Sequence, residues 1–205
     1  MRLRRRIILA TALLIMTGLT GACTAEKPFL IVDYQLPASS QALEGKRLSL
    51  AVNDIREDKT FLSENAKKSL RTFNDTYSLV VLKEDGSGNL TGIYDLNALL
   101  AEIFKQRLAS MGIQVAPSVE SSDYELEIKL KEFKLDLANR KWVASMIYQA
   151  DLVKDGSVRA METISGSAER LKVMTKNDAE KVLSELLTDM ANKLDLTRLF
   201  QQARQ

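Results

Sequence analysis

The most constraining feature of this sequence is a strict alternation of apolar and charged residues that begins at Tyr124. The apolar residues at every second position are Tyr124, Leu126, Ile128 and Leu130, and the charged residues between them are Glu125, Glu127, Lys129 and Lys131. A period of two is typical of a β-strand with one buried face and one solvated face. The apolar set then shifts to Phe133, Leu135 and Leu137, and this change of parity predicts a β-bulge near residues 131–132.

Further strands are predicted on both sides of this segment. Residues 142–152 alternate in the same way, and Asp155-Gly156 is a hairpin signal that leads into a strand over 158–171. Upstream, residues 47–52 alternate, and two apolar runs at 77–82 and 90–94 flank a glycine-rich turn. The sequence therefore predicts hairpins and long antiparallel strands.

Two amphipathic helices are predicted, one over 96–111 and one over about 178–194. Asp95 is placed to cap the first helix and Gly112 to end it. The second helix has a stripe of apolar residues at i, i+3 and i+4 spacing. A shorter helix with Ser63 as its cap is predicted near 63–71. The predicted fold class is α+β, a mainly antiparallel sheet with two amphipathic helices packed on one face.

The N-terminus has the layout of a bacterial lipoprotein leader. Four arginines within residues 2–6 precede an apolar run over 7–19, and small residues lead to Cys23, the only cysteine. This pattern predicts a signal peptide over 1–22. The segment 19–23 resembles the lipobox, in which the cysteine is acylated, although Thr20 replaces the commoner leucine. Cys23 is therefore the predicted lipidation site; ordinary secretion and a retained short anchor are the alternatives.

The mature chain is predicted to consist of a lipidated N-terminus and tether over 23–46, followed by a single domain over 47–205. An apolar piece at 29–32 inside the tether is interpreted as a strand added to a sheet edge. Removal of the leader's four arginines leaves 25 basic and 27 acidic side chains. The mature chain is thus nearly neutral and has no basic stripe, so nucleic acid is excluded as a partner.

The sequence contains no catalytic system that we recognise. It has no histidine, which excludes serine–histidine and cysteine–histidine nucleophiles and the commonest zinc ligand. Asp54, Glu57 and Asp58 are interleaved with Arg56 and Lys59, so a salt-paired loop is favoured over an acid–base pair. We therefore predict no catalytic residue, no metal site and no cofactor. Trp142 is a candidate recognition aromatic, with core packing as the simpler interpretation.

Several segments together resemble the YajG family of envelope lipoproteins. They are the lipobox, the strand 47–52, the helix start 95–100 and its ending 108–115, and the likeness continues to about residue 200. The plan is also similar to auxiliary lipoproteins of ABC-type lipid transport systems. The resemblance implies a periplasm-facing domain on a lipid anchor, and it supplies no catalytic residues.

Two functions remain open at this stage. The preferred one is a non-enzymatic outer-membrane lipoprotein that contacts another envelope protein through a sheet edge or an open face. The alternative is an auxiliary lipoprotein that binds lipid or another apolar ligand, which requires an apolar cavity. A hydrolase is disfavoured because no nucleophile system is present. Thr24 is not the aspartate that retains many lipoproteins in the inner membrane, and by that resemblance we expect outer-membrane attachment facing the periplasm.

Overall fold

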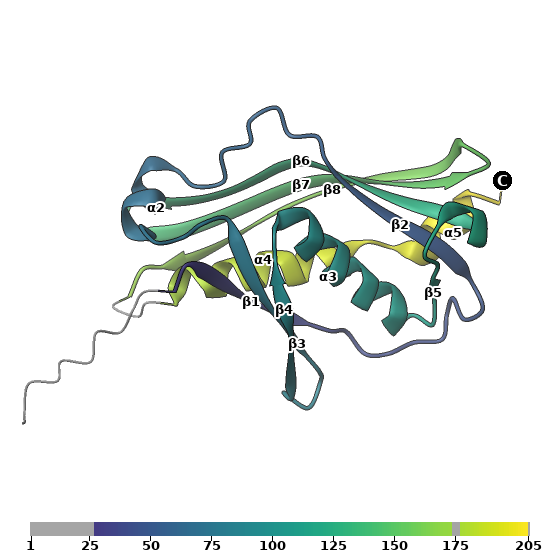
Figure 1. The fold of residues 1–205 in the computed structure, drawn as a ribbon, viewed down its shortest axis with the longest axis horizontal. Helices are drawn as coiled ribbons and strands as arrows, with labels where there is room; N and C mark the ends of the chain where they lie inside the picture. The colour runs from purple at the N-terminus through teal and green to yellow at the C-terminus, as the bar shows by residue number, and fades with distance from the viewer. Residues whose placement is uncertain (1–26, 174–176, 205) are drawn as a thin grey trace, which may run out of the picture.

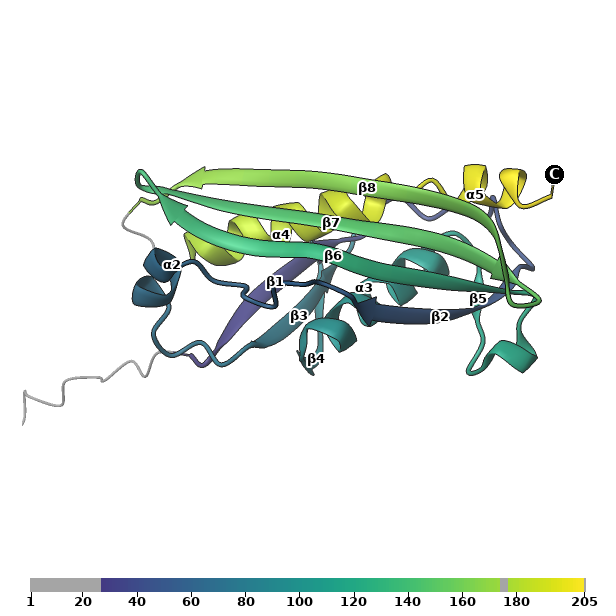
Figure 2. The same cartoon turned by 90° about the horizontal axis from the view of Figure 1, so that it is seen from above.

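The computed structural model describes residues 27–173 and 177–204, which form two mixed β-sheets and several helices. Helices α3 and α4 and the smaller sheet cover one face of the larger sheet (Figures 1 and 2). The fold class is α+β, as predicted, with both main helices on one face of the larger sheet.

The larger sheet has the strand order β5-β2-β6-β7-β8. Its strands are β2 (Arg47–Asp54), β5 (Gln114–Val115), β6 (Tyr124–Ala138), β7 (Lys141–Lys154) and β8 (Ser157–Leu171). Strands β6, β7 and β8 are antiparallel neighbours, as their alternation and the Asp155-Gly156 turn predicted. The register shifts between Leu130 and Glu132, which confirms the predicted bulge.

The smaller sheet has the order β1-β3-β4 and consists of β1 (Phe29–Gln35), β3 (Thr76–Leu82) and β4 (Gly88–Tyr94). The predicted β3–β4 hairpin is confirmed, and β1 runs parallel to β3. The structure thus has two mixed sheets, whereas the prediction described a single, mainly antiparallel sheet. Strand β2 also runs parallel to both β5 and β6. Parallel strands are joined by long connections, so no turn motif in the sequence indicates that they pair.

The helices are α2 (Glu64–Ser69), α3 (Leu96–Ser110), α4 (Asp178–Lys193) and α5 (Leu196–Gln202), with a 3-10 turn η1 at Val119–Ser121. The predicted caps are confirmed for two of them, because the Asp95 carboxylate accepts from the Ala98 amide and Ser63 Oγ accepts from the Ala66 amide. Gly112, with φ of 80°, ends α3 in the left-handed conformation.

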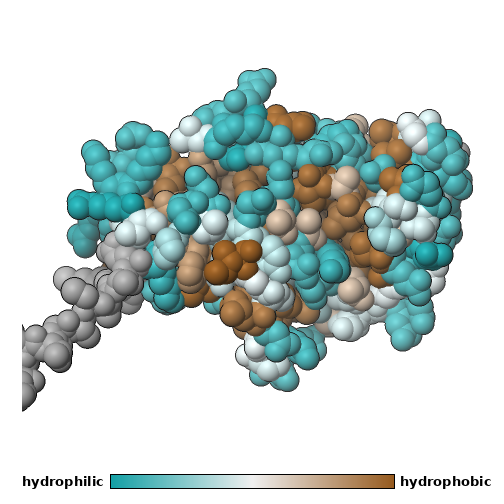
Figure 3. Space-filling model, viewed as in Figure 1, coloured by the Kyte–Doolittle hydropathy of each residue, from teal (hydrophilic) through white to brown (hydrophobic). Residues whose placement is uncertain are grey.

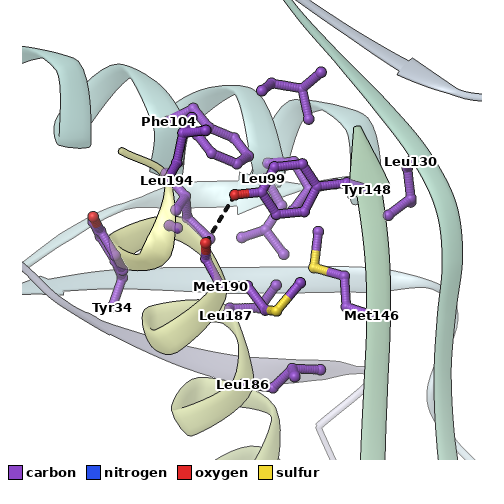
Figure 4. Close-up of a cluster of buried hydrophobic side chains, with 14 of the residues drawn as sticks. Tyr34, Leu99, Phe104, Leu130, Met146, Tyr148, Leu186, Leu187, Met190 and Leu194 are labelled. Carbon is purple, nitrogen blue, oxygen red and sulfur yellow. Dashed lines mark hydrogen bonds between the residues drawn. The ribbon is translucent and has the colours of Figure 1, made fainter. Parts of the chain in front are cut away.

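The core lies between the larger sheet and the layer formed by α3, α4 and the smaller sheet. At its centre Phe104 of α3 packs edge-to-face on Tyr148 of β7, with ring centroids 5.4 Å apart (Figure 4). The Tyr148 hydroxyl donates to the carbonyl of Met190 in α4 at 2.8 Å, and burial raises the pKa of this tyrosine. Gly166 of β8 lets α4 approach closely, since a Cβ there would lie 2.6 Å from Met190 Sδ.

The N-terminal boundary of the folded body differs from the prediction. Leu30, Val32 and Tyr34 of β1 are buried in the core, and residues 40 and 43 are hydrogen-bonded to the end of α3. The body therefore begins at β1, not at residue 47, and most of the predicted tether is part of it. Residues 29–32 are all apolar, so no alternation marked them as a half-buried strand. The strand does lie at a sheet edge, as interpreted.

Candidate functional site

The outer face of the smaller sheet carries exposed apolar side chains. Alternation within β1, β3 and β4 turns one set of side chains into the core and leaves another set outside. We use the name small-sheet face for five apolar residues of the outer set, Ile31, Val80, Leu82, Leu90 and Ile93; Asp33, Gln35 and Ser78 lie on the same side of the sheet. Leu90 and Ile93 are 69% and 60% exposed. Figure 3 shows apolar residues at the surface in this region, around the position that β4 occupies in Figure 1. Contiguous exposed apolar surface of this kind marks interaction sites.

The outer edge of β4 borders this face. Strand β4 is the last in its sheet, and no strand in the described part of the chain pairs with its outer edge. A free edge presents unpaired amide and carbonyl groups to which another extended segment can add. Leu90 and Ile93 therefore stand beside a backbone that is itself open to pairing.

The opposite edge of the smaller sheet is closed by α4. Four polar side chains of α4 follow one another at intervals of four residues, and they bond to the backbone or a side chain of β1: Glu180, Ser184, Thr188 and Asn192. The amides of Ile31, Asp33 and Gln35 donate to the first three of them at 2.9, 2.9 and 3.1 Å. We call this arrangement the α4–β1 seam. It satisfies the edge amides of β1, so β1 is not open to a further strand.

A polar hollow lies on the outside of the α4–β1 seam. Its volume is about 440 Å³, and its lining residues are Asp33, Gln35, Ser184, Glu185, Thr188, Asp189 and Asn192. Arg170 pairs with Glu185, and Lys193 pairs with Asp189 at 2.7 Å. This hollow is open to solvent, and carbon atoms of these polar side chains form most of its wall. An open hollow of this kind does not enclose an apolar ligand.

The outer face of the larger sheet is polar, as the alternation predicted. Lys129 Nζ lies 2.8 Å from an Asp151 carboxylate oxygen and 3.0 Å from a Glu127 carboxylate oxygen. The hydrogen bond to Asp151 is the largest contribution that raises the pKa of Lys129. The charged side chains of β6 and β7 thus compensate one another on a solvated face, on which Val158 and Met161 of β8 are exposed apolar residues.

The carboxylates after β2 are held in a salt-paired loop, as favoured from the sequence. Both Asp54 carboxylate oxygens accept from the Arg56 guanidinium, at 3.0 and 2.9 Å, and Lys59 also lies 3.0 Å from this carboxylate. These contacts, led by the Arg56 hydrogen bond, hold the pKa of Asp54 well below its usual range. Asp58 pairs with Lys134 at 3.5 Å. Glu57 is exposed.

A metal site is not evident among these or other acidic groups. In the described residues no three Asp, Glu or Cys side chains gather in a way that could hold a metal ion. None of the helices in that part of the chain is long and apolar enough to cross a membrane.

Trp142 is not an exposed recognition aromatic. It is 3% exposed and packs in the core, with Lys172 Nζ 5.8 Å from its ring centroid. The residue lies on the inward side of β7 together with Ala144 and Met146, so the alternation that predicted the strand also placed its indole inside. The simpler interpretation, core packing, is the one that the structure supports. Cys23, the predicted lipidation site, lies outside the described residues.

The comparisons with known proteins concern the fold. The chain is similar to the crystal structure of protein XCC0632 from Xanthomonas campestris, described as DUF330, with a TM-score of 0.53 and 15% identity over 85% of this chain and 99% of that one. It is also similar to a minor lipoprotein from Acinetobacter baumannii, with a TM-score of 0.39 and 14% identity over 78% of this chain and 94% of that one. Nothing is inferred from the second likeness, whose TM-score is below 0.5.

Sequence comparison adds no closer relative. No protein-family model matches the chain, and no curated protein matches it significantly. At 15% identity the likeness to the Xanthomonas protein concerns the arrangement of the chain in space. The protein therefore shares the overall fold of the DUF330 structure, over nearly the whole length of that structure.

Proposed function

We propose that this protein is a non-enzymatic envelope lipoprotein that docks another envelope protein through the small-sheet face and the free edge of β4. The observation that carries the proposal is the coincidence of an exposed apolar face with an open strand edge. Leu90 and Ile93 contribute to both, because they project from the edge strand itself. The partner that fits is an extended segment with apolar side chains, which adds to β4 as a further strand.

The alternative is a carrier of lipid or another apolar ligand, and no observation on the described residues favours it. A carrier needs a concave apolar cavity of several hundred cubic ångströms. The hollow beside the α4–β1 seam is large enough, but it is open to solvent, and every residue that lines it has a polar or charged side chain. Between the helices and the larger sheet, side chains such as Phe104, Tyr148 and Met190 fill the space.

The location that we propose is the outer membrane, with the domain facing the periplasm. Its support is the leader pattern, the lipobox resemblance at Cys23 and the absence of aspartate at position 24. We expect Cys23→Ala to move the protein from the membrane fraction to the soluble periplasmic or precursor pool, because the acyl chains provide the attachment. Membrane fractionation with density separation measures this. An unchanged outer-membrane fraction in the variant would contradict lipid anchoring at Cys23.

The docking surface is tested by crosslinking from defined positions. A photoreactive side chain at position 90 or 93 is expected to give a discrete crosslinked product in intact cells. The same side chain at position 158, where Val158 is 55% exposed on the larger sheet, is the control and is expected to give none. Because the contacts are apolar, Leu90→Glu should reduce the product from position 93 about tenfold or more, whereas Val158→Glu should leave it unchanged.

Stability is measured in parallel so that unfolding is not mistaken for lost docking. Substitutions at exposed positions usually change stability by less than about 0.5 kcal/mol. Leu90→Glu should therefore unfold at nearly the wild-type temperature. Equal products from positions 93 and 158, or a product that is insensitive to Leu90→Glu, would refute docking at the small-sheet face.

A further inference from the structure

The described body begins very close to the proposed lipid anchor. The carbonyl of Lys27 accepts from the Thr72 hydroxyl at 3.1 Å, and the carbonyl of Pro28 accepts from the Asn74 amide at 3.0 Å. Lys27 is four residues after Cys23, and four residues span at most about 14 Å when fully extended. If Cys23 is acylated, as proposed above, the end of the molecule where β1 begins is held next to the lipid headgroups.

That end of the molecule is strongly basic. It comprises four segments, 27–28, 64–75, 139–140 and 171–173, which we call the basic end. Its cations are Lys27, Lys67, Lys68, Arg71, Arg140 and Lys172, and its carboxylates are Glu64 and Asp75. All six cationic residues are exposed, and within the described part of the chain Lys67 alone among them has an ion pair, with Glu64 at 2.9 Å. Counted over these four segments, the basic end has a formal excess of four positive charges, although the mature chain as a whole is nearly neutral. The carboxylate of Asp178 also adjoins it, because this buried residue accepts from the Val173 amide at 2.9 Å.

Hydrogen bonds join the four segments into one surface. The Lys172 amide donates to the Arg140 carbonyl at 2.7 Å, and the Lys172 ammonium donates to Ser69 of α2 at 3.0 Å. The contact between Thr72 and Lys27 connects the α2 region to the start of β1. Figures 1 and 2 show α2 and the start of β1 at the same end of the long axis of the molecule.

Two exposed apolar side chains lie within this basic surface. Leu171 is 60% exposed and Val173 is 62% exposed, and they flank Lys172 in sequence. Exposed apolar groups among lysines and arginines are the pattern of surfaces that bind at a membrane interface. There the cations attract anionic headgroups, and the apolar groups enter the boundary with the acyl chains.

We propose that the basic end is a membrane-docking surface that binds anionic phospholipid headgroups, with Leu171 and Val173 in the interfacial layer. The short connection to Cys23 and the charge complementarity select the bilayer as the occupant. This contact orients the domain with its long axis pointing away from the membrane. The small-sheet face then points sideways, where a partner can reach it.

The test uses the mature chain with Cys23→Ser, which has no acyl chains, in flotation with lipid vesicles. We expect binding to vesicles of phosphatidylethanolamine and phosphatidylglycerol that weakens as salt is raised, and little binding to pure phosphatidylcholine. The double variant Lys68→Gln, Arg71→Gln should bind about 30-fold more weakly, at about 1 kcal/mol for each cation. The matched control, Lys83→Gln with Arg159→Gln, removes the same charge from exposed positions elsewhere and should bind like the parent chain.

The apolar contribution is tested separately with Leu171→Ser and Val173→Ser, against Val158→Ser as the control. The proposal would be overturned if the two double charge variants bound the vesicles equally, or if the parent chain bound both kinds of vesicle equally. It would also be overturned if the basic end bound an acidic protein and no vesicles. Because the Cys23→Ser chain used in the flotation test lacks acyl chains, the outcome does not depend on whether Cys23 is lipidated in cells. Fractionation of the Cys23→Ala variant decides that question independently.

Discussion

Replacing Phe104 by alanine is expected to lower the free energy of unfolding by about 4 kcal/mol. The ring is 1% exposed and packs on Tyr148, so its removal leaves a cavity that the helix and sheet cannot fill by a small movement. For a chain of this size the midpoint of thermal unfolding should fall by roughly 10 °C. Thermal and urea unfolding, followed by circular dichroism, measure both quantities.

Two control variants separate packing from hydrogen bonding in the same region. Tyr148→Phe removes only the bond to the Met190 carbonyl and should cost about 1 kcal/mol. Leu90→Ala shortens a side chain that is 69% exposed and should change stability by less than about 0.5 kcal/mol. If Phe104→Ala were no more destabilising than Tyr148→Phe, the packing described around Phe104 would be incorrect.

Replacing Arg56 by methionine is expected to cost about 3 kcal/mol at pH 7. The Arg56 side chain is 6% exposed and bonds to both Asp54 carboxylate oxygens and, at 3.1 Å, to the Phe133 carbonyl of β6. Methionine fills much of the same volume but leaves the carboxylate without its main partner. Lys59→Met is the control, because Lys59 is 57% exposed and should contribute less than about 1 kcal/mol.

The same ion pair predicts the direction of the pH dependence. Contacts with Arg56 and Lys59 lower the pKa of Asp54 in the folded state. A depressed carboxyl pKa stabilises the fold above the unfolded-state value of about 4, and this stabilisation is lost as pH falls below that value towards the folded pKa. The stability difference between wild type and Arg56→Met should therefore narrow between pH 7 and pH 3. A difference that stays constant or widens on acidification would show that Asp54 is not the group involved.

Strands β6, β7 and β8 of the larger sheet and the two main helices could be predicted because local patterns specify them. The alternation from Tyr124 fixes which side chains are buried in β6, and its change of parity marks the bulge between Leu130 and Glu132. Asp95 and Gly112 mark the ends of α3 because capping depends on neighbouring residues only. These features do not depend on which strand lies alongside.

The pairing of β1 with β3 in the smaller sheet could not be predicted in the same way. Residues 29–32 and 79–82 are apolar without alternation, since side chains on both faces are apolar, and the partner of β1 lies more than forty positions away along the chain. The small-sheet face was missed for the same reason. The unbroken apolar runs in β1 and β3 could have indicated it. Such runs imply a strand whose two faces are both buried, or a strand with one exposed apolar face.

The sequence did contain one unused signal for α4. Glu180, Ser184, Thr188 and Asn192 form a polar row at intervals of four beside the apolar stripe of this helix. A solvated helix face has no need of such regular hydrogen-bonding groups. For Trp142 the sequence pattern was sufficient, because the alternation in β7 already places this residue on the buried side of the strand.

The α4–β1 seam also has a mechanical consequence if the protein is attached by its N-terminus, as we propose. Strand β1 is bonded along its length to β3 on one side and to α4 on the other. A force applied through the anchor along the axis of β1 loads these bonds together in shear, so they do not open one after another. Thermal motion of the membrane or of a bound partner is therefore transmitted to α4 and the core, and the first strand is not peeled from the domain.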